Sequence, residues 1–477
     1  MSRLTPMLLG TLLVGCSYGG SNDSPLRHGG VPQSTVSPAD VVDSEDPPED
    51  PEVECDNEAP VVLYVSPDDS NSMSSPVQAR EWALTGGAQW TPIRTWEFLN
   101  YATWDYAPSA TPGELALDVQ LAQGEHAGEY TMQVGISSER VDAALRPPVN
   151  LTMSVDQSGS MSGEPMDRVK DALRAINGSL LEGDVISVVL WSNDADVALD
   201  GHVATGPDDP VFAKAIASLA TGGGTDLSGG LQRAYQVAER NDHPARINRV
   251  LLLSDGGANI GVTDADVIGG HAEDIDQEGI YMVGVGAGSA ASYNDALMDT
   301  VTDLGRGASV FIPSADEAQR MFGDRFLEVV GTAARDVQIS YTLPPGFEVV
   351  RFSGEEISRN PEEVRPQHLA PNDSMVLHQH LETCAKTPLG AEITVTVSYR
   401  DAVTFEERSV GVTSTVGELL DKDAPQLWKG AAVFAYAETL KGAEGAANRV
   451  RVALERAEEA NPGDADLAEM RQVLAAL

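Results

Sequence analysis

Short apolar runs alternate with amphipathic segments over residues 148–333, and this rhythm is the clearest pattern in the chain. Many of the runs are rich in β-branched residues, as in strands buried on both faces, and they predict strands at 150–155, 184–191, 249–253, 280–285 and 308–312. Between the first two runs, apolar residues recur at helical spacing from Glu164 and Pro165, which suit a helix start, to Gly183. The pattern predicts a doubly wound, mostly parallel α/β sheet with helices on both faces.

The segments on either side of this unit show the two-residue period of antiparallel strands. Ile393, Val395 and Val397 alternate with hydroxyl residues, and the apolar residues of 115–121 alternate in the same way. Other expected strands, separated by turn residues, are 61–65, 129–136, 337–343, 347–352, 374–381 and 404–410. Because edge strands need partners, we expect the strands before residue 140 and after residue 335 to form one antiparallel β-sandwich.

The two ends of the chain follow neither pattern. Residues 416–477 carry three apolar stripes at helical spacing, with a break at Asn461-Pro462-Gly463, and predict C-terminal helices. Residues 17–60 hold eleven acidic residues, seven prolines and no apolar period, so we expect a disordered acidic tether. The expected organisation is a signal peptide at 1–16, the tether at 17–60, a β-containing N-terminal segment at 61–147, the α/β domain at 148–333, an antiparallel sandwich region at 334–415 and a helical region at 416–477.

The first sixteen residues have the layout of an export signal. Arg3 precedes an apolar run from Met7 to Val14, which is too short to span a bilayer as a helix. Leu13-Val14-Gly15-Cys16 resembles a bacterial lipobox, which implies that Cys16 is acylated; an ordinary cleaved signal is the alternative. By analogy with lipoproteins, Ser17 favours the outer membrane. We expect a lipid-anchored protein of the bacterial cell envelope that meets the membrane only through its anchor.

Composition and charge narrow the class of partner. With 42% apolar residues the chain has the material for a sizeable core, but its net charge of −42 would repel nucleic acids and anionic membrane surfaces. A cationic partner or divalent ions fit this charge better. Cys55 and Cys384 are the cysteines that remain beyond the signal, and in an exported protein either one disulfide or two thiols is consistent with them.

Three loops of the expected α/β domain carry oxygen ligands for a hard cation. Asp156, Ser158 and Ser160 alternate directly after the first strand, and we expect the glycine between the two serines to let the backbone bend. Thr225 follows three glycines, and Asp255 follows a later strand. The carboxyl ends of parallel strands meet at one edge of a sheet, and Mg²⁺ prefers such oxygens. The sequence therefore predicts one divalent metal site, with Mg²⁺ as its ion and Mn²⁺ or Ca²⁺ as alternatives.

The same residues match a known metal site. Asp156-x-Ser158-x-Ser160, Thr225 in G-G-G-T-D and Asp255 in S-D-G resemble the metal-ion-dependent adhesion site (MIDAS) of von Willebrand factor type A domains, with all five side chains present. Three further stretches are similar to bacterial exported proteins that carry this domain between an N-terminal family segment and a C-terminal region of unknown function: F-L-N-Y-A-T-W-D-Y-A-P at 98–108, N-R-V-L-L-L-S-D-G-G-A-N-I-G-V-T at 248–263 and S-Y-N-D-A-L-M at 292–298. The resemblance implies a Rossmann-like α/β fold, a metal at the rim of its sheet, and binding through an acidic residue of a partner protein.

The resulting hypothesis is a binding protein rather than an enzyme. It captures, through the bound metal, a protein ligand that offers an acidic side chain. A catalytic serine needs a base within reach, and the absence of histidine from the three loops argues against Ser158 or Ser160 as a nucleophile. The alternative is a structural scaffold or assembly factor of the cell envelope, in which the metal only stabilises the fold. His378 and His380 share one expected strand face, but without a nearby third ligand we interpret them as half-exposed strand residues rather than a zinc site.

Overall fold

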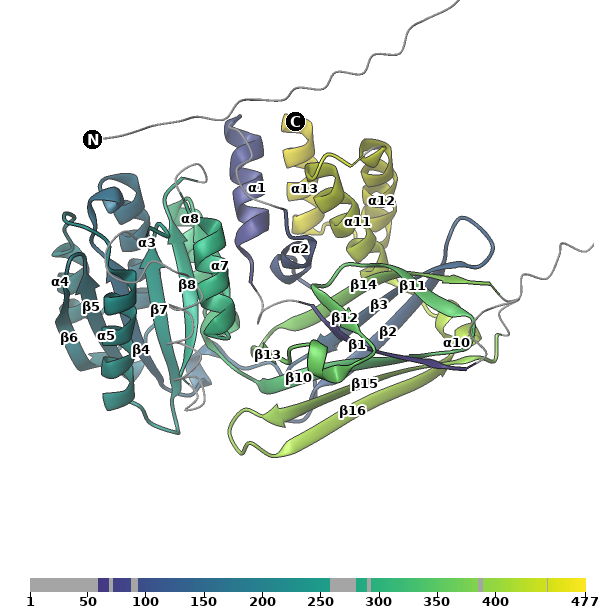
Figure 1. Ribbon diagram of the computed structural model, residues 1–477, viewed down its shortest axis with the longest axis horizontal. Helices are drawn as coiled ribbons and strands as arrows, with labels where there is room; N and C mark the ends of the chain where they lie inside the picture. Colours follow the sequence, from purple (N-terminus) through teal and green to yellow (C-terminus); the bar gives the residue numbers. More distant parts are fainter. Residues whose placement is uncertain are drawn as a thin grey trace, which may run out of the picture. The chain divides into compact units, whose positions relative to one another are not determined.

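The computed structural model describes residues 59–67, 72–86, 93–257, 280–289, 293–384, 389–443 and 445–477, which all belong to one compact unit. The sheet of the α/β domain consists of β4 (Val149–Asp156), β5 (Glu182–Trp191), β6 (Ala195–Thr205), β7 (Ile247–Ser254), β8 (Tyr281–Ala287) and β9 (Ser309–Ile312). Their order is β6-β5-β4-β7-β8-β9, and each of these neighbouring pairs is parallel except β5 with β6 (Figure 1). The expected doubly wound, mostly parallel sheet is confirmed.

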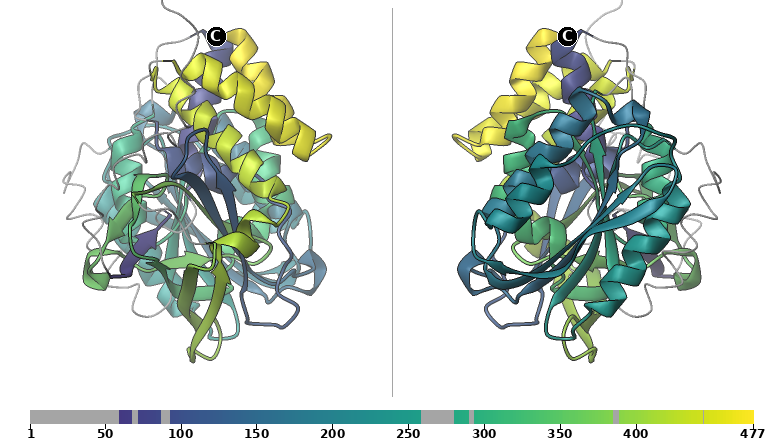
Figure 2. Two further views of the ribbon diagram at one scale, coloured as in Figure 1. Left: turned by 90° about the vertical axis from the view of Figure 1, so that its right-hand side faces the viewer. Right: turned by 90° about the vertical axis from the view of Figure 1, so that its left-hand side faces the viewer.

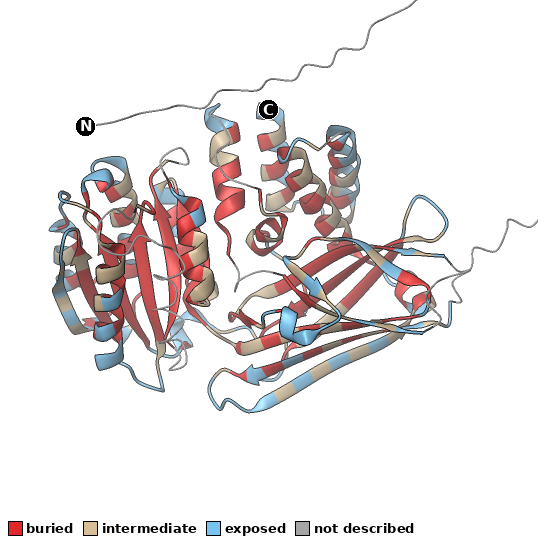
Figure 3. Ribbon diagram, viewed as in Figure 1, coloured by how far each residue is buried: buried red, intermediate tan, exposed pale blue. Residues whose placement is uncertain are grey.

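Helices cover both faces of this sheet because its inner strands are buried on both sides. On one face, α3 (Glu164–Gly178), α4 (Pro210–Ala217), α8 (Ala315–Gln319) and α9 (Phe326–Val330) share an apolar core with the strands. On the other face, α5 (Leu227–Arg240) and α7 (Asp295–Leu304) share a second core with them. Short helical turns occur at η1 (Ala143–Leu145), η2 (Gly159–Met161) and η3 (Arg320–Asp324). Figure 3 shows the buried strands between the two helical layers.

The central strand β4 is buried along its whole length, yet only one of its faces is apolar. Its apolar residues belong to the same core as α3 and are Val149, Leu151, Met153 and Val155. The alternate residues Asn150, Thr152 and Ser154 are polar and buried, and Trp191 Nε1 donates a hydrogen bond to Ser154 Oγ at 3.0 Å. Because side chains alternate along a strand, Asp156 continues this polar row at the carboxyl end of β4.

Two boundaries of the α/β domain differ from the sequence pattern. The helix expected to run to Gly183 ends at Gly178, although Leu180 beyond it still packs into the same core and extends the apolar stripe. The pattern also does not predict β6, whose residues are exposed or half-exposed over nearly the whole strand and include Asp196 and Asp200. An edge strand of this kind is held by its antiparallel pairing with β5 rather than by burial.

The antiparallel strands that flank the α/β domain in sequence form two sheets with a common apolar core. One sheet has the order β12-β1-β10-β15-β16, with β13 paired to β10, and the other has the order β11-β14-β3-β2. The bounds are β1 (Val61–Ser66), β2 (Ala116–Gln123), β3 (Glu129–Ser137), β10 (Ala334–Leu343), β11 (Phe347–Phe352), β12 (Glu356–Ser358), β13 (Gln367–Leu369), β14 (Ser374–Thr383), β15 (Glu392–Asp401) and β16 (Glu407–Thr415), with a turn η4 at Pro361–Glu363. Strands from before and after the α/β domain therefore pair with each other, as expected.

The strand expected at 404–410 is wrong in its start, because β16 begins at Glu407. The Asp401 side chain accepts hydrogen bonds from the backbone N–H groups of Val403 and Thr404, at 2.9 and 2.8 Å. Phe405 then has a φ of 60°, which a strand does not accommodate. The apolar residues 403 and 405 therefore belong to the turn between β15 and β16.

Two helices in the segment before the α/β domain are not predicted by the sequence pattern, α1 (Ser74–Thr85) and α2 (Thr95–Tyr101). Two residues mark the ends of α1 in the sequence: Pro76 lies in its first turn, and Gly86, with a φ of 72°, follows its last residue. Val77 of α1 packs with α5 and α7, whereas Ala79 and Ala83 pack with the C-terminal helices. Thus α1 lies between the α/β domain and those helices, as Figure 1 shows; the views of Figure 2 look along the direction that joins the two parts.

The chain ends in helices α10 (Val416–Leu420), α11 (Pro425–Leu440), α12 (Ala446–Ala460) and α13 (Ala465–Ala476), which confirms the expected C-terminal helices. The break expected at 461–463 separates α12 from α13, and Asp464 caps α13 by accepting from the backbone N–H of Leu467 at 3.1 Å. The fully buried Lys429 of α11 donates to Asp464 and Asp466 at 2.6 and 2.7 Å. This pairing joins α11 to the start of α13.

His378 on β14 is fully buried, so the expectation that it is half-exposed is wrong. Its Nδ1 lies 2.8 Å from Gln133 Oε1, and its ring centroid is 5.7 Å from that of Phe434 on α11. The expectation fails because the C-terminal helices cover this face of the sheet. Burial, together with the charges of His380 and Arg351, lowers the pKa of His378 to about 3.

We expect acid to destabilise the protein through His378. Between pH 6.5 and 3 the unfolded chain binds a proton that the folded chain excludes, so this contribution is full above pH 6.5 and is lost as the pH falls. From pH 6.5 to 5 the loss amounts to about 2 kcal/mol. Urea unfolding at several pH values should show a shallower acid slope for His378→Gln, with His126→Gln at an exposed histidine as control. Equal slopes for wild type and His378→Gln would contradict the prediction.

Candidate metal centre

The first loop of the candidate site begins at Asp156, the last residue of β4. This carboxylate is fully buried, and its two oxygens have different partners. Oδ1 accepts the backbone N–H of Ser158 at 2.8 Å, and Oδ2 accepts the hydroxyl of Ser254 at 2.7 Å. The hydroxyls of Ser158 and Ser160 lie 3.0 Å apart, with Ser158 buried and Ser160 exposed. One turn of chain therefore places a carboxylate and two hydroxyls together.

Backbone hydrogen bonds tie the glycine-rich loop before α5 to this turn. Gly222 N donates to the carbonyl of Gln157 at 2.7 Å, and Gly159 N donates to the carbonyl of Gly223 at 3.1 Å. The same turn is joined to β5, because Gln157 N donates to the carbonyl of Trp191 at 2.8 Å. These bonds fix the path of the loop that leads to Thr225, which is itself buried.

Positive φ angles occur in the glycine-rich loop of the site. Gly159, the glycine at which a bend is expected, is the first residue of the turn η2 and does not have a positive φ. Gly222 and Gly223 have φ values of 154° and 94°. A Cβ at Gly223 would also lie 3.1 Å from Ser192 Oγ, so the conformation and the close approach both require glycine there.

The third loop follows β7 and brings Asp255 to the other two. Asp255 is buried, and its Oδ1 accepts the backbone N–H of Gly257 at 3.1 Å. A Cβ placed on Gly257 would lie 3.2 Å from Asp255 Oδ1, 3.8 Å from Thr225 Cγ2 and 3.9 Å from Ser160 Oγ. Residues from all three loops thus surround one small space, which is kept free because Gly257 has no side chain.

The two acidic side chains of the site are close enough to interact. Burial raises the pKa of Asp156 to about 6, the hydrogen bonds from Ser158 and Ser254 oppose this rise, and the charge of Asp255 adds to it. Two carboxylates held together in a buried place favour a nearby positive charge.

The residues present fit a hard divalent cation. All five side chains offer oxygen, as Mg²⁺ requires. Two are the carboxylates of Asp156 and Asp255, and three are the neutral hydroxyls of Ser158, Ser160 and Thr225. Within the described residues, no group of three or more His, Cys, Asp or Glu side chains is placed to hold a metal, so a site rich in carboxylates or histidines is not an alternative there. Ser254 is a residue that sequence reasoning missed, although it stands in the S-D-G motif, because its bond to Asp156 joins two different strands.

The structure describes one of the three cysteines of the chain. Cys384 is disulfide-bonded, while Cys16 and Cys55 lie outside the described residues. The expected lipid attachment at Cys16 and residues 17–58 of the expected tether likewise fall outside the described part of the chain. Among the described helices, none combines the length and the apolar character needed to cross a bilayer.

Comparisons with known proteins match the middle of the chain to one domain family. Residues 151–258 match the von Willebrand factor type A domain family. The chain is similar to YfbK of Escherichia coli strain K12, with 29% identity over 264 residues that cover 54% of this chain and 45% of YfbK. It is also similar to human inter-alpha-trypsin inhibitor heavy chain H3, with 26% identity over 153 residues that cover 31% of this chain and 17% of that protein.

Among solved structures, a von Willebrand factor type A protein from Catenulispora acidiphila shares 17% identity with a TM-score of 0.45, covering 75% of this chain and 88% of that one. The matched regions span less than half the length of both curated relatives, at 45% and 17%. The protein contains a von Willebrand factor type A domain and is similar to YfbK over about half of its own length.

Proposed function

We propose that the protein is a binding protein that captures an acidic group of a partner protein through a divalent cation, Mg²⁺ or alternatively Mn²⁺ or Ca²⁺. The ion would be held by Asp156, Ser158, Ser160, Thr225 and Asp255. The observation that carries the proposal is the meeting of Ser160, Thr225 and Asp255 around the space beside Gly257. Ser158 lies 3.0 Å from Ser160, and Asp156 accepts the backbone N–H of Ser158. Ser160 and Gly159 are exposed, so the site has a side from which a partner can approach.

The chemistry of the donors determines what the ion attracts. Hydroxyl oxygens carry no charge, so only Asp156 and Asp255 offset the charge of a divalent ion. When bound, the ion supplies an electrophilic position that a carboxylate from another molecule can occupy. The chain's own part is to hold the donors together and to leave the outer side open.

The surroundings of the site narrow the partner further. The loops at 156–165, 192–196, 222–226 and 254–257 contain no lysine or arginine, and Glu164 and Asp194 on them are exposed. These charges repel a uniformly acidic surface. The partner that fits is an acidic residue surrounded by neutral or basic ones.

The proposed location is the bacterial cell envelope, with an acylated Cys16 as the membrane anchor. Its support is the lipobox-like Leu13-Val14-Gly15-Cys16 and the acidic tether that follows it. An anchored binding protein would hold its metal site away from the membrane by the length of this tether.

The test of the metal is a titration of purified protein with MgCl₂ and MnCl₂. We expect binding heat in calorimetry and a rise in melting temperature with metal concentration, because a ligand of the native state stabilises it. Subsequent addition of EDTA should reverse the rise. No heat and no thermal shift at millimolar metal would show that the proposal is wrong.

Chelation also distinguishes the proposed function from a scaffold role. In native envelopes, the proposed metal-dependent capture predicts that EDTA added before the crosslinker prevents capture of the partner protein. Capture that persists in EDTA, with the metal still raising the melting temperature, would favour a scaffold in which the ion only stabilises the fold. Turnover of a substrate would require a base beside the ion, and the three loops contain no histidine.

A further inference from the structure

Asp295, the first residue of α7, is a buried carboxylate held by the segment that precedes the α/β domain. Arg94 donates to both of its oxygens, from Nη1 to Oδ2 at 2.5 Å and from Nη2 to Oδ1 at 3.0 Å. From α1, Gln78 Nε2 and Ser74 Oγ donate to Oδ1 at 2.6 and 3.0 Å. The start of α7 is thus fixed by side chains more than 200 positions away in sequence.

The residue before Asp295 contacts the third loop of the metal centre. Asn294 N donates to the carbonyl of Asp255 at 2.9 Å. Gly256 has a φ of 79°, and a Cβ at this position would lie 2.6 Å from Asn294 O. The backbone around Asp255 therefore packs directly on the start of α7, so a displacement of Asn294 displaces Asp255.

Arg94 is the cation at the centre of this contact. Besides Asp295 it pairs with Glu97, the residue of α2 that also accepts the backbone N–H of Ser75 at 2.5 Å. Asp299, one turn further along α7, lies 3.6 Å from Arg94 Nε. The side chain of Arg94 is 11% exposed, and those of Glu97 and Asp295 are 0% and 2% exposed. Removing the cation would leave these buried carboxylates without their charged partner, which lowers the stability of the fold.

We infer that Arg94 is a positioning residue for the metal centre: by holding Asp295 it keeps Asn294, and through it Asp255, in the metal-binding arrangement. The inference rests on the proposed function, because it assumes that Asp255 serves a metal. It also couples two parts of the chain. Docking of the α1–α2 segment raises metal affinity, and by reciprocity metal binding strengthens that docking.

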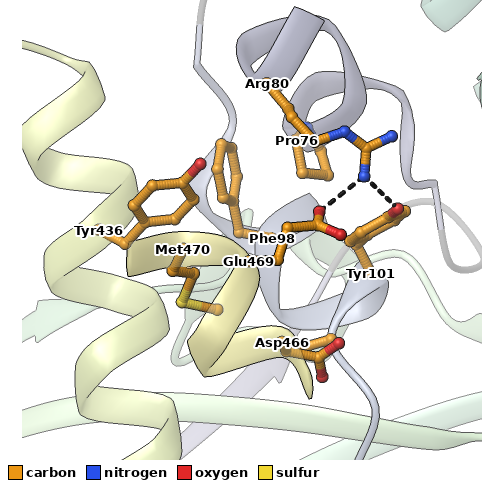
Figure 4. Close-up of a pocket in the computed structure, with 9 residues that line it drawn as sticks. Pro76, Arg80, Phe98, Tyr101, Tyr436, Asp466, Glu469 and Met470 are labelled. Carbon is orange, nitrogen blue, oxygen red and sulfur yellow. Dashed lines mark hydrogen bonds and ion pairs between the residues drawn. The ribbon is translucent and has the colours of Figure 1, made fainter. Parts of the chain in front are cut away.

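The test compares two arginines of the same segment. Arg94→Gln should weaken Mn²⁺ binding by about tenfold or more, as is typical when a group that orients a metal ligand is removed. The matched control is Arg80→Gln. Figure 4 shows Arg80 of α1 beside a small pocket, with bonds to Glu469 of α13 and to Tyr101 of α2. Arg80 Nη1 donates to Glu469 Oε1 at 2.6 Å and to the Tyr101 hydroxyl at 2.7 Å. Arg80 also pairs with Glu317, but none of these contacts is to α7.

Mn²⁺ affinity is measured on the full-length protein from the electron paramagnetic resonance signal of free Mn²⁺, at a temperature below the melting transition of each variant. Melting curves of the metal-free variants are recorded as well. The expected result is that both variants melt earlier and only Arg94→Gln loses affinity and alters the spectrum of the bound ion. Equal affinity for Arg94→Gln and wild type would overturn the inference. Absence of Mn²⁺ binding by wild type would instead overturn the proposed function.

A second measurement does not depend on the folding of Arg94→Gln. In the wild type, saturating Mg²⁺ should slow amide hydrogen exchange in α1 and α2, because the coupling acts in both directions. In Arg80→Gln the same slowing should persist. Metal that binds but leaves exchange in these helices unchanged would contradict the coupling.

Discussion

Asp156→Asn abolishes the stabilisation that the protein gains from Mg²⁺ or Mn²⁺. At a metal concentration one hundred times the Kd, we expect wild type to gain about 2.7 kcal/mol and the variant to gain nothing measurable. Asparagine keeps an oxygen that can accept the Ser158 N–H but removes the charge that holds the ion. Metal-free stability should stay equal or rise, because the buried pair of like charges with Asp255 is removed. Calorimetry and melting curves with and without metal measure both quantities.

A matched control for this experiment is Asp209→Asn, another buried aspartate of the same domain. Asp209 caps α4 by accepting the backbone N–H groups of Val211 and Phe212 at 2.9 and 3.0 Å, and it also accepts from Thr205. This variant should lower metal-free stability and leave metal affinity unchanged. A metal response in Asp156→Asn equal to that of wild type would exclude Asp156 from the site.

Arg146→Met should destabilise the fold more than the loss of any exposed ion pair. Arg146 Nη1 and Nη2 donate to Asp184 at 3.0 and 2.5 Å, and the two side chains are 1% and 0% exposed. Asp184 also accepts the backbone N–H of Val149 at 2.9 Å, so it anchors the entry of the chain into β4. Leaving this carboxylate buried without its cation lowers the free energy of unfolding by about 3–5 kcal/mol, measured by urea denaturation.

The comparison for this prediction is Arg240→Met. Arg240 pairs with Asp200 at 3.0 Å, but these side chains are 50% and 48% exposed. Water and salt screen such a pair, so its loss should cost less than about 1 kcal/mol. If Arg146→Met costs no more than Arg240→Met, the buried pair does not stabilise the entry into β4.

Much of the fold follows from local patterns. The strands of the α/β domain lie close to the apolar runs, because burial on both faces requires continuous apolar sequence. The flanking strands follow from their two-residue period, as at Ile393 and Val395. The sequence pattern fails to predict an element correctly where side chains are not buried periodically. The strand β6 is an exposed edge strand, and the turn before β16 is closed by the side chain of Asp401.

The candidate site could be predicted as a set of residues but not as an arrangement. Asp156, Ser158 and Ser160 are neighbours in sequence, so their motif is visible without a structure. The hydrogen bond from Ser254 to Asp156 joins residues 98 positions apart, and the backbone bonds between the glycine loop and the serine turn depend on how β4, β5 and α5 pack. Such contacts leave no trace in the composition of either segment.

The sequence alone determined the α/β class, the residues of the candidate centre and the elements that carry them, because period and motif are local properties. The place of α1 between the α/β domain and the C-terminal helices came only from the tertiary structure. So did the link from Arg94 through Asp295 to the Asp255 loop. The physical reason is that an ion pair between two single side chains 201 positions apart creates no periodic pattern in the sequence. The pair forms and becomes buried only when the segment that carries Arg94 packs against α7.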